Sequence, residues 1–123
     1  MPTQWMHRGI KLGAIILGLV TTQAAGAATV TTAWAPGVGT QDDCLAIGVE
    51  AVQRAGFRAS VSRDRQGVYG WRGQDNISIR CIADRDVAAI FIYTWDGRDN
   101  DWLIRVVQDA YRRLPPPPLP PPR

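Results

Sequence analysis

The sequence contains few of the side chains on which enzymes most often depend. Among its 123 residues there is one histidine, His7, and one lysine, Lys11, and both lie near the N-terminus. The rest of the chain therefore has no imidazole for a Ser–His or Cys–His nucleophile and no amine for a Schiff base or a phosphate-binding loop. Glu50 and the aspartates leave carboxylate catalysis open. That chemistry usually needs a deep cleft, which a domain of this size can hardly frame.

Cysteine is equally scarce, with only Cys44 and Cys81 in the chain. The two lack the Cys-x-x-Cys spacing of a redox pair, so we expect a structural disulfide. The bond would close a loop of about 37 residues, which the chain-entropy model values at roughly 4 kcal/mol. A disulfide in so small a domain is typical of a protein from an oxidising compartment.

No apolar run reaches the length of about 20 residues that a membrane-spanning helix needs. A run without polar side chains lies at residues 12–20, after Arg8 and Lys11, and the small residues Ala25-Gly26-Ala27 follow it. This order is typical of a secretory signal peptide, which we predict over residues 1–27. We therefore expect an exported protein, periplasmic or secreted, with no stable membrane anchor after cleavage.

Neither sign of charge is in excess beyond the predicted signal. Residues 28–123 carry 12 arginines and 11 acidic residues, hence a net charge of +1. A nucleic-acid binder draws its affinity from basic side chains that neutralise phosphates. The charge balance therefore predicts that nucleic acid is not the partner.

The pattern of residues predicts a helix early in the mature chain. Residues 28–39 show neither helical nor sustained alternating periodicity, and we expect them to form an N-terminal tether. A helix is predicted over residues 41–55, where Thr40 and Asp43 can cap its start and Gly56 can end it.

Strands are expected to follow, and then a second helix. Period-two alternation predicts strands near residues 57–62, 67–72 and 77–81, and the run 87–95 is apolar on both faces, which indicates a well-buried, central strand. A helix over residues 101–114 ends the domain. We expect an α+β two-layer sandwich in α-β-β-β-α order, with an antiparallel three-stranded meander and two helices on one face, as a single domain over residues 40–114.

The chain closes with a proline-rich tail, residues 115–123. Proline neither continues a helix nor donates to a sheet, so we expect an extended polyproline II segment that stands free of the domain. It is interpreted either as a ligand for an aromatic groove or as a stiff spacer, and folding should not depend on it.

Aromatic and arginine side chains mark a possible binding surface. Tyr69, Trp71 and Arg72 stand together on one predicted strand, and Trp95 and Arg98 flank the end of another. This mixture is enriched at protein recognition sites and also suits stacking on sugars, although the interpretation that the sequence favours is that the tryptophans cover a small core. The acidic loop 96–101 lacks the spacing of an EF-hand, so we expect no metal site and no cofactor.

Two resemblances follow from these motifs. The αβββα order resembles the double-stranded RNA-binding domain, but Asp99, Asn100 and Asp101 stand where that family places basic residues. Cys44 on a first helix, AGF at 55–57, IRC at 79–81 and a following apolar strand together resemble small exported bacterial proteins of unassigned function. The second resemblance implies a fold and a compartment, but no activity.

We therefore expect an exported, disulfide-stabilised, non-catalytic module that binds an unknown protein or an envelope polymer. One alternative is a small carboxylate-dependent hydrolase. The other is a structural accessory protein that works through its proline-rich tail.

Overall fold

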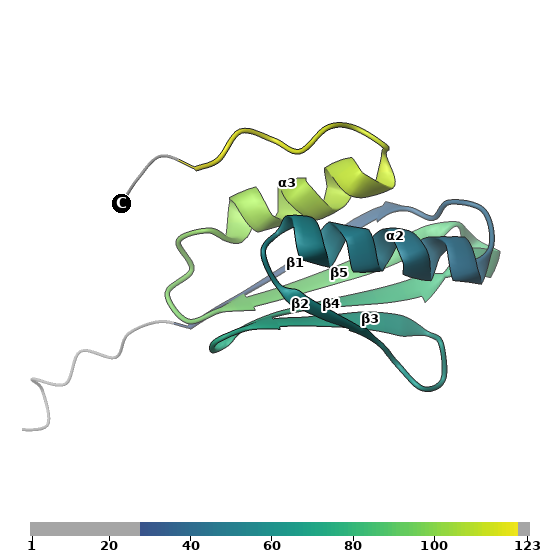
Figure 1. The fold of residues 1–123 in the computed structure, drawn as a ribbon, viewed down its shortest axis with the longest axis horizontal. Helices are drawn as coiled ribbons and strands as arrows, with labels where there is room; N and C mark the ends of the chain where they lie inside the picture. The colour runs from purple at the N-terminus through teal and green to yellow at the C-terminus, as the bar shows by residue number, and fades with distance from the viewer. Residues whose placement is uncertain (1–27, 121–123) are drawn as a thin grey trace, which may run out of the picture.

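The computed structural model describes residues 28–120, which form two layers (Figure 1). One layer is a five-stranded antiparallel sheet and the other consists of two helices, both on the same face of the sheet, so the α+β expectation is confirmed. The elements in chain order are β1 Thr29–Pro36, α2 Gln41–Arg54, β2 Arg58–Val61, β3 Gly67–Arg72, β4 Asp75–Ile82, the short 3-10 helix η1 Ala83–Arg85, β5 Val87–Thr94 and α3 Asn100–Tyr111. The predicted signal peptide, residues 1–27, lies outside the described part of the chain.

The first strand corrects the prediction of a tether over residues 28–39. β1 pairs with β5 from Thr29 opposite Thr94 to Pro36 opposite Val87, which gives the order β1-β5-β4-β3-β2 in place of a three-stranded meander. The sequence conceals this strand because its inward side chains are small or polar, as at Thr31 and Ala35, whereas Val30 and Trp34 point outward and are exposed. The usual alternation of apolar inside and polar outside is thus reversed.

Helix α2 forms where the sequence predicted it. The Thr40 side chain accepts from the Asp43 amide at 3.1 Å, and the Asp43 carboxylate accepts from the Thr40 amide at 3.0 Å, which completes a capping box. Hydrogen bonding of the Asp43 carboxylate to the Thr40 backbone amide, and then to the Thr40 side chain, lowers the pKa of the Asp43 carboxyl. The helix ends before Gly56, whose φ of +86° few other residues tolerate.

Helix α3 is anchored by a buried amide that the sequence did not single out. Asn100, 3% exposed, donates to the Thr31 hydroxyl at 2.7 Å and also bonds the hydroxyl of Thr94. The first turn of α3 is therefore tied to β1 and to β5 at once. The helix ends at Tyr111, three residues before the predicted end at residue 114.

The core lies between the two layers. Branched aliphatic side chains from the inner face of the sheet meet those of the helices, and they include Ile77, Ile79, Ile90 and Ile92 of the sheet and Leu45, Val52, Leu103, Val106 and Val107 of the helices. A disulfide joins Cys44 of α2 to Cys81 of β4, with 6.0 Å between the Cα atoms, so the predicted link between helix and sheet is confirmed. Neither helix in residues 28–120 combines the length and the apolar character required to cross a bilayer.

The C-terminal segment does not stand free of the domain as expected. In Figure 1 the described tail runs back along α3, on the side of the helix that faces away from the sheet. The indole N–H of Trp102 donates to the carbonyl of Pro118 at 2.8 Å, and Arg54 donates to the carbonyl of Leu114 at 3.1 Å. The reversal occurs at Arg113, which has a φ of +57°. Sequence periodicity carries no signal for such a turn.

Candidate functional site: an open aromatic face

The face of the sheet opposite the helices is uncovered by any other element of residues 28–120 (Figure 1). Aromatic side chains gather on this face and at its end, each with 43% to 65% of its surface exposed: Trp34, Tyr69, Trp71, Phe91 and Trp95. We define the aromatic face as the outward side chains of the five strands. Exposed apolar surface that gathers on one face in this way is typical of an interaction site.

Strand register divides the face into aromatic and polar columns. Phe91 and Tyr93 project from β5, and Tyr69 and Trp71 project from β3. On β4, between them, Ser78 is the register partner of both Phe91 and Tyr69. Neighbouring strands lie about 4.8 Å apart, so the two aromatic columns are separated by roughly 10 Å across a polar column.

The polar column consists of Asn76, Ser78 and Arg80. Asn76 repeats the arrangement of Ser78, because it stands opposite Tyr93 on one side and Trp71 on the other. Successive outward residues on a strand are about 7 Å apart, so the same aromatic-polar-aromatic row occurs twice along the sheet. Amide, hydroxyl and guanidinium groups are thus available between aromatic rings.

The prediction that β5 is buried on both faces was wrong for its outward face. Ala88, Ile90 and Ile92 are buried as expected, and the strand is interior to the sheet. Phe91, however, is about half exposed, because no second layer covers its face. An apolar run on both faces indicated a strand buried on both sides, whereas here the outward half forms an exposed surface.

The charge on the aromatic face is of one sign. Arg58 of β2 and Arg80 of β4 point outward, and none of the outward residues of the five strands is a carboxylate. Asp64, in the β2–β3 turn, lies close enough to Arg80 to feel its charge. Hydrogen bonds from Ser62 and from the Gln66 amide, and then the charge of Arg80, lower the pKa of that carboxyl. The face therefore presents a weakly positive surface.

Two shallow hollows lie at the β3–β4 turn, where the aromatic face ends. The first, of about 490 Å³, is lined by Gly56, Arg58, Trp71, Arg72 and Gly73. The second, of about 380 Å³, lies beside it and is lined by Arg72, Gly73, Gln74, Asp75, Trp95 and Asp96. Arg72 stands between them, paired with Asp75 at 3.2 Å and with its guanidinium 4.5 Å from the centre of the Phe57 ring.

The structure brings together four of the five residues that the sequence indicated. Tyr69 and Trp71 lie on the aromatic face, and Arg72 and Trp95 line the hollows. Arg98 lines a different hollow, beside Trp102 and the tail. Its guanidinium lies 3.7 Å from the carboxylate of Asp96.

Sequence reasoning missed Trp34, Arg58, Phe91 and Tyr93. The spacing of the aromatic residues at 91, 93 and 95 was a usable signal, since alternate residues of a strand share a face. Trp34 could not be placed without knowing that β1 exists.

Carboxylate catalysis finds little support in the hollows. Asp75 and Asp96 line the same hollow, but Asp75 accepts the Trp95 amide at 2.9 Å on one oxygen and Arg72 on the other. Asp96 accepts the Arg98 amide at 3.1 Å. Both carboxylates are therefore engaged in holding turns. Among residues 28–120 there is no group of three or more histidine, cysteine or acidic side chains placed to hold a metal ion.

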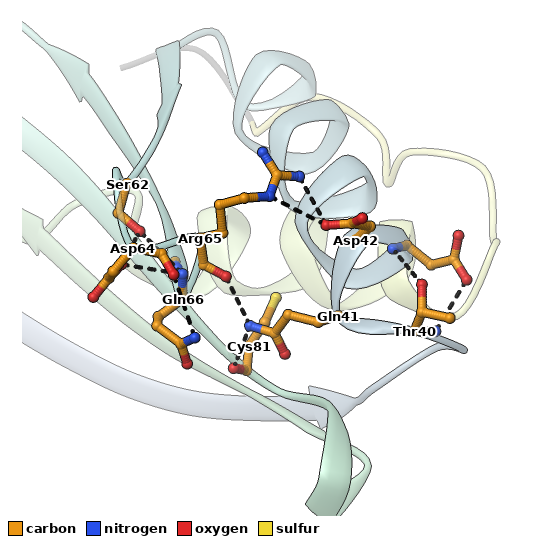
Figure 2. Close-up of polar contacts among 10 residues, drawn as sticks. Thr40, Gln41, Asp42, Ser62, Asp64, Arg65, Gln66 and Cys81 are labelled. Atoms are coloured by element: carbon orange, nitrogen blue, oxygen red, sulfur yellow. Dashed lines mark hydrogen bonds and ion pairs between the residues drawn. The ribbon is translucent and has the colours of Figure 1, made fainter.

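The polar cluster at the other end of the sheet has a structural role (Figure 2). The Gln41 amide donates to the carbonyls of Arg65 and Cys81 at 3.1 and 3.0 Å, and its oxygen accepts the Ala83 amide at 3.2 Å. Asp42 pairs with Arg65 at 2.8 Å. The start of α2 is thereby fastened to the β2–β3 turn and to the end of β4, and the polar atoms of Gln41 are satisfied.

The aromatic face, with the two hollows at its end, is therefore the best candidate for a functional surface. Comparison of the chain with known protein families, with curated proteins and with solved structures finds no match.

Proposed function

We propose that the chain is an exported, non-catalytic binding module that holds an extended polymer of the cell envelope on its aromatic face. The observation that carries the proposal is the exposure of Tyr69, Trp71 and Phe91 on a sheet face that no described element covers. Burying such side chains against a partner releases apolar surface from water, and aromatic residues dominate the energy of recognition surfaces.

The alternation of columns favours a polymer over a flat protein surface. Rings of a polymer can stack on the aromatic columns, while Asn76 and Ser78 offer hydrogen bonds to hydroxyl groups between them. The row of side chains that contains Ser78 is followed along the strands by a second row of the same kind, which contains Asn76. A repeated row suits a ligand with repeated units, and a glycan has both rings and hydroxyls.

The disulfide supports the compartment. Cys44 and Cys81 are bonded, as in proteins that fold in an oxidising environment, and residues 1–27 have the sequence pattern of a signal peptide. The resemblance to small exported bacterial proteins leads to the same compartment. An envelope polymer is the ligand that such a protein would meet there.

A sedimentation assay tests the proposed function. The full chain, recovered after export, is incubated with insoluble glycans, namely peptidoglycan sacculi, chitin and cellulose, and the pelleted fraction is measured. We expect pelleting with at least one of them and a loss of at least tenfold in the variant Tyr69→Ser/Phe91→Ser. Trp102→Phe is the matched control, because Trp102 lies on the helical layer.

Two results would contradict the proposal. One is the absence of pelleting with every glycan. The other is pelleting that the Tyr69→Ser/Phe91→Ser variant retains while its circular dichroism spectrum stays native.

A further inference from the structure

We infer that the hollow beside Arg58 binds an anionic group, so that the ligand of the aromatic face is an acidic glycan. This inference rests on the proposed function and adds the chemical class of the polymer. It starts from the residues around Arg58, at the outer edge of the sheet.

Arg58 is an exposed and unengaged cation. It stands on the edge strand β2, directly opposite Trp71 in the register, and it lines the hollow of about 490 Å³. Its side chain takes part in none of the hydrogen bonds or ion pairs formed within residues 28–120. A guanidinium group offers several donors in a planar fork, which matches the two oxygens of a carboxylate.

Arg72, the other cation of the hollow, has a different role. Its guanidinium is paired with Asp75 and lies over the Phe57 ring, so its charge is largely compensated and its position is fixed. Arg72 therefore shapes the wall of the hollow, while Arg58 supplies the free charge. Trp71 lines the same hollow, where its indole can contact the sugar ring that carries the anion.

The charge of the whole face agrees with an anionic partner. Arg58 and Arg80 are its two charged side chains, and the outward residues of the strands include no acid to repel a negative ligand. Arg58 lies opposite Trp71, and Trp71 lies opposite Asn76, so Arg58 and Asn76 belong to the same row across the sheet. Arg80 follows Asn76 by four residues on β4. The rows of the two arginines are therefore about 13 Å apart along the strand direction. A polymer with a charge on successive units can meet both.

A second copy of this chain does not fit the face. Two aromatic faces packed against each other would bury Arg58 and Arg80 of both copies, with no carboxylate among the outward strand residues to pair with them. Buried charges without partners are strongly unfavourable.

The test is a calorimetric titration of the full exported chain with polygalacturonate and, as a neutral match, with the same polymer fully methyl-esterified. We expect the ester to bind at least tenfold more weakly. Arg58→Gln should weaken binding to polygalacturonate about ten- to a hundredfold, the usual effect of losing a charged hydrogen-bond partner. Arg63→Gln is the matched control, since Arg63 is exposed in the β2–β3 turn, and it should stay within about twofold.

Other outcomes separate this inference from the proposed function. Equal binding of both polymers, with loss on Trp71→Ala, overturns the acidic ligand and leaves the glycan module standing. Polyphosphate bound as tightly as polygalacturonate overturns the inference, because charge alone would then suffice. Binding of oligothymidylate in preference to either glycan overturns it in favour of nucleic acid. Loss of all glycan binding in both assays overturns the proposed function itself.

Discussion

Gly48 lies where α2 packs closely against α3 and β3. A Cβ atom at this position would lie 2.8 Å from the Tyr111 hydroxyl oxygen and 2.9 Å from a methyl carbon of Val68. Glycine costs a helix interior about 1 kcal/mol relative to alanine. The chain keeps glycine here because the close packing of helix against sheet leaves no room for a side chain.

Replacing Gly48 with alanine should therefore destabilise the protein, although alanine is the better helix former. We expect the free energy of unfolding to fall by about 1 to 3 kcal/mol in urea denaturation, as overpacked cores do. Ala46→Gly, on the exposed side of the same helix, measures the propensity effect alone. Stabilisation by Gly48→Ala would mean that α2 lies farther from Tyr111 than described.

Tyr111 is a buried phenol with a structural task. Its hydroxyl donates to the carbonyl of Cys44 at 2.9 Å, and burial raises the pKa of the phenol above its usual value of 10.0. The folded chain therefore keeps this proton at a pH where the unfolded chain releases it. The contribution to stability is complete below pH 10 and declines as the pH rises further.

The variant Tyr111→Phe should separate the effect of the hydrogen bond to Cys44 from the effect of burying an ionisable phenol. At pH 7 the variant loses the hydrogen bond, which we expect to cost about 1 kcal/mol of unfolding free energy. Above about pH 10 the wild type should lose stability more steeply than the variant, so the difference between their free energies of unfolding narrows. Urea titrations at several pH values measure this difference, and parallel curves would refute the burial of the phenol.

At the scale of elements, β1 is the least expected part of the fold. Substitutions on its inward and outward sides test whether residues 29–36 form a paired strand. Ala35 points into the core and is fully buried, whereas Thr32 points outward. Ala35→Asp should lower the free energy of unfolding by about 3 kcal/mol or more, because it buries a charge without a partner. Thr32→Asp, its matched control, should change it by less than about 0.5 kcal/mol. Equal effects in thermal denaturation would show that residues 29–36 are not a paired strand.

The elements also show which parts of the structure a sequence specifies locally. Helix α2 was predictable because its cap at Thr40, its buried stripe and its terminating Gly56 are all near one another in the chain. β1 was not, because its place beside β5 depends on pairing over more than fifty residues, and its inward side chains are small or polar. The part of the aromatic face that lies on β3 was found from Tyr69 and Trp71. The other residues of the aromatic face could not be found in this way, because the order of the strands in the sheet determines which side chains lie beside Phe91 and Arg58.

At the scale of the whole molecule, the disulfide is the only side-chain cross-link between the two layers within residues 28–120. The variant Cys44→Ala/Cys81→Ala should lose about 4 kcal/mol of unfolding free energy, which is much of the total in a small domain. Differential scanning calorimetry should show a melting temperature lower by ten degrees or more, by the usual scaling of about 4 to 8 degrees per kcal/mol. A shift of about two degrees or less would mean that the unfolded chain is already compact without the bond.

The docked tail should contribute much less. Truncation after Leu114 removes the bond from Trp102 to Pro118, which is exposed, so we expect a loss of at most about 1 kcal/mol. The same truncation in a Trp102→Phe background should have a smaller effect, since the bond is already absent there. Equal losses in both backgrounds, measured by urea denaturation, would show that the tail stabilises the domain through other contacts.

The position of the disulfide also determines how long it survives. Cys44 and Cys81 are each 1% exposed, and the Tyr111 hydroxyl lies 3.7 and 3.8 Å from their sulfur atoms. A reducing thiolate must reach a sulfur directly, so it can attack only a molecule whose layers have parted. Reduction then proceeds no faster than this opening, however much reductant is present. The cross-link preserves the fold and the fold shields the cross-link, which gives the protein a lifetime set by kinetics as well as by equilibrium stability.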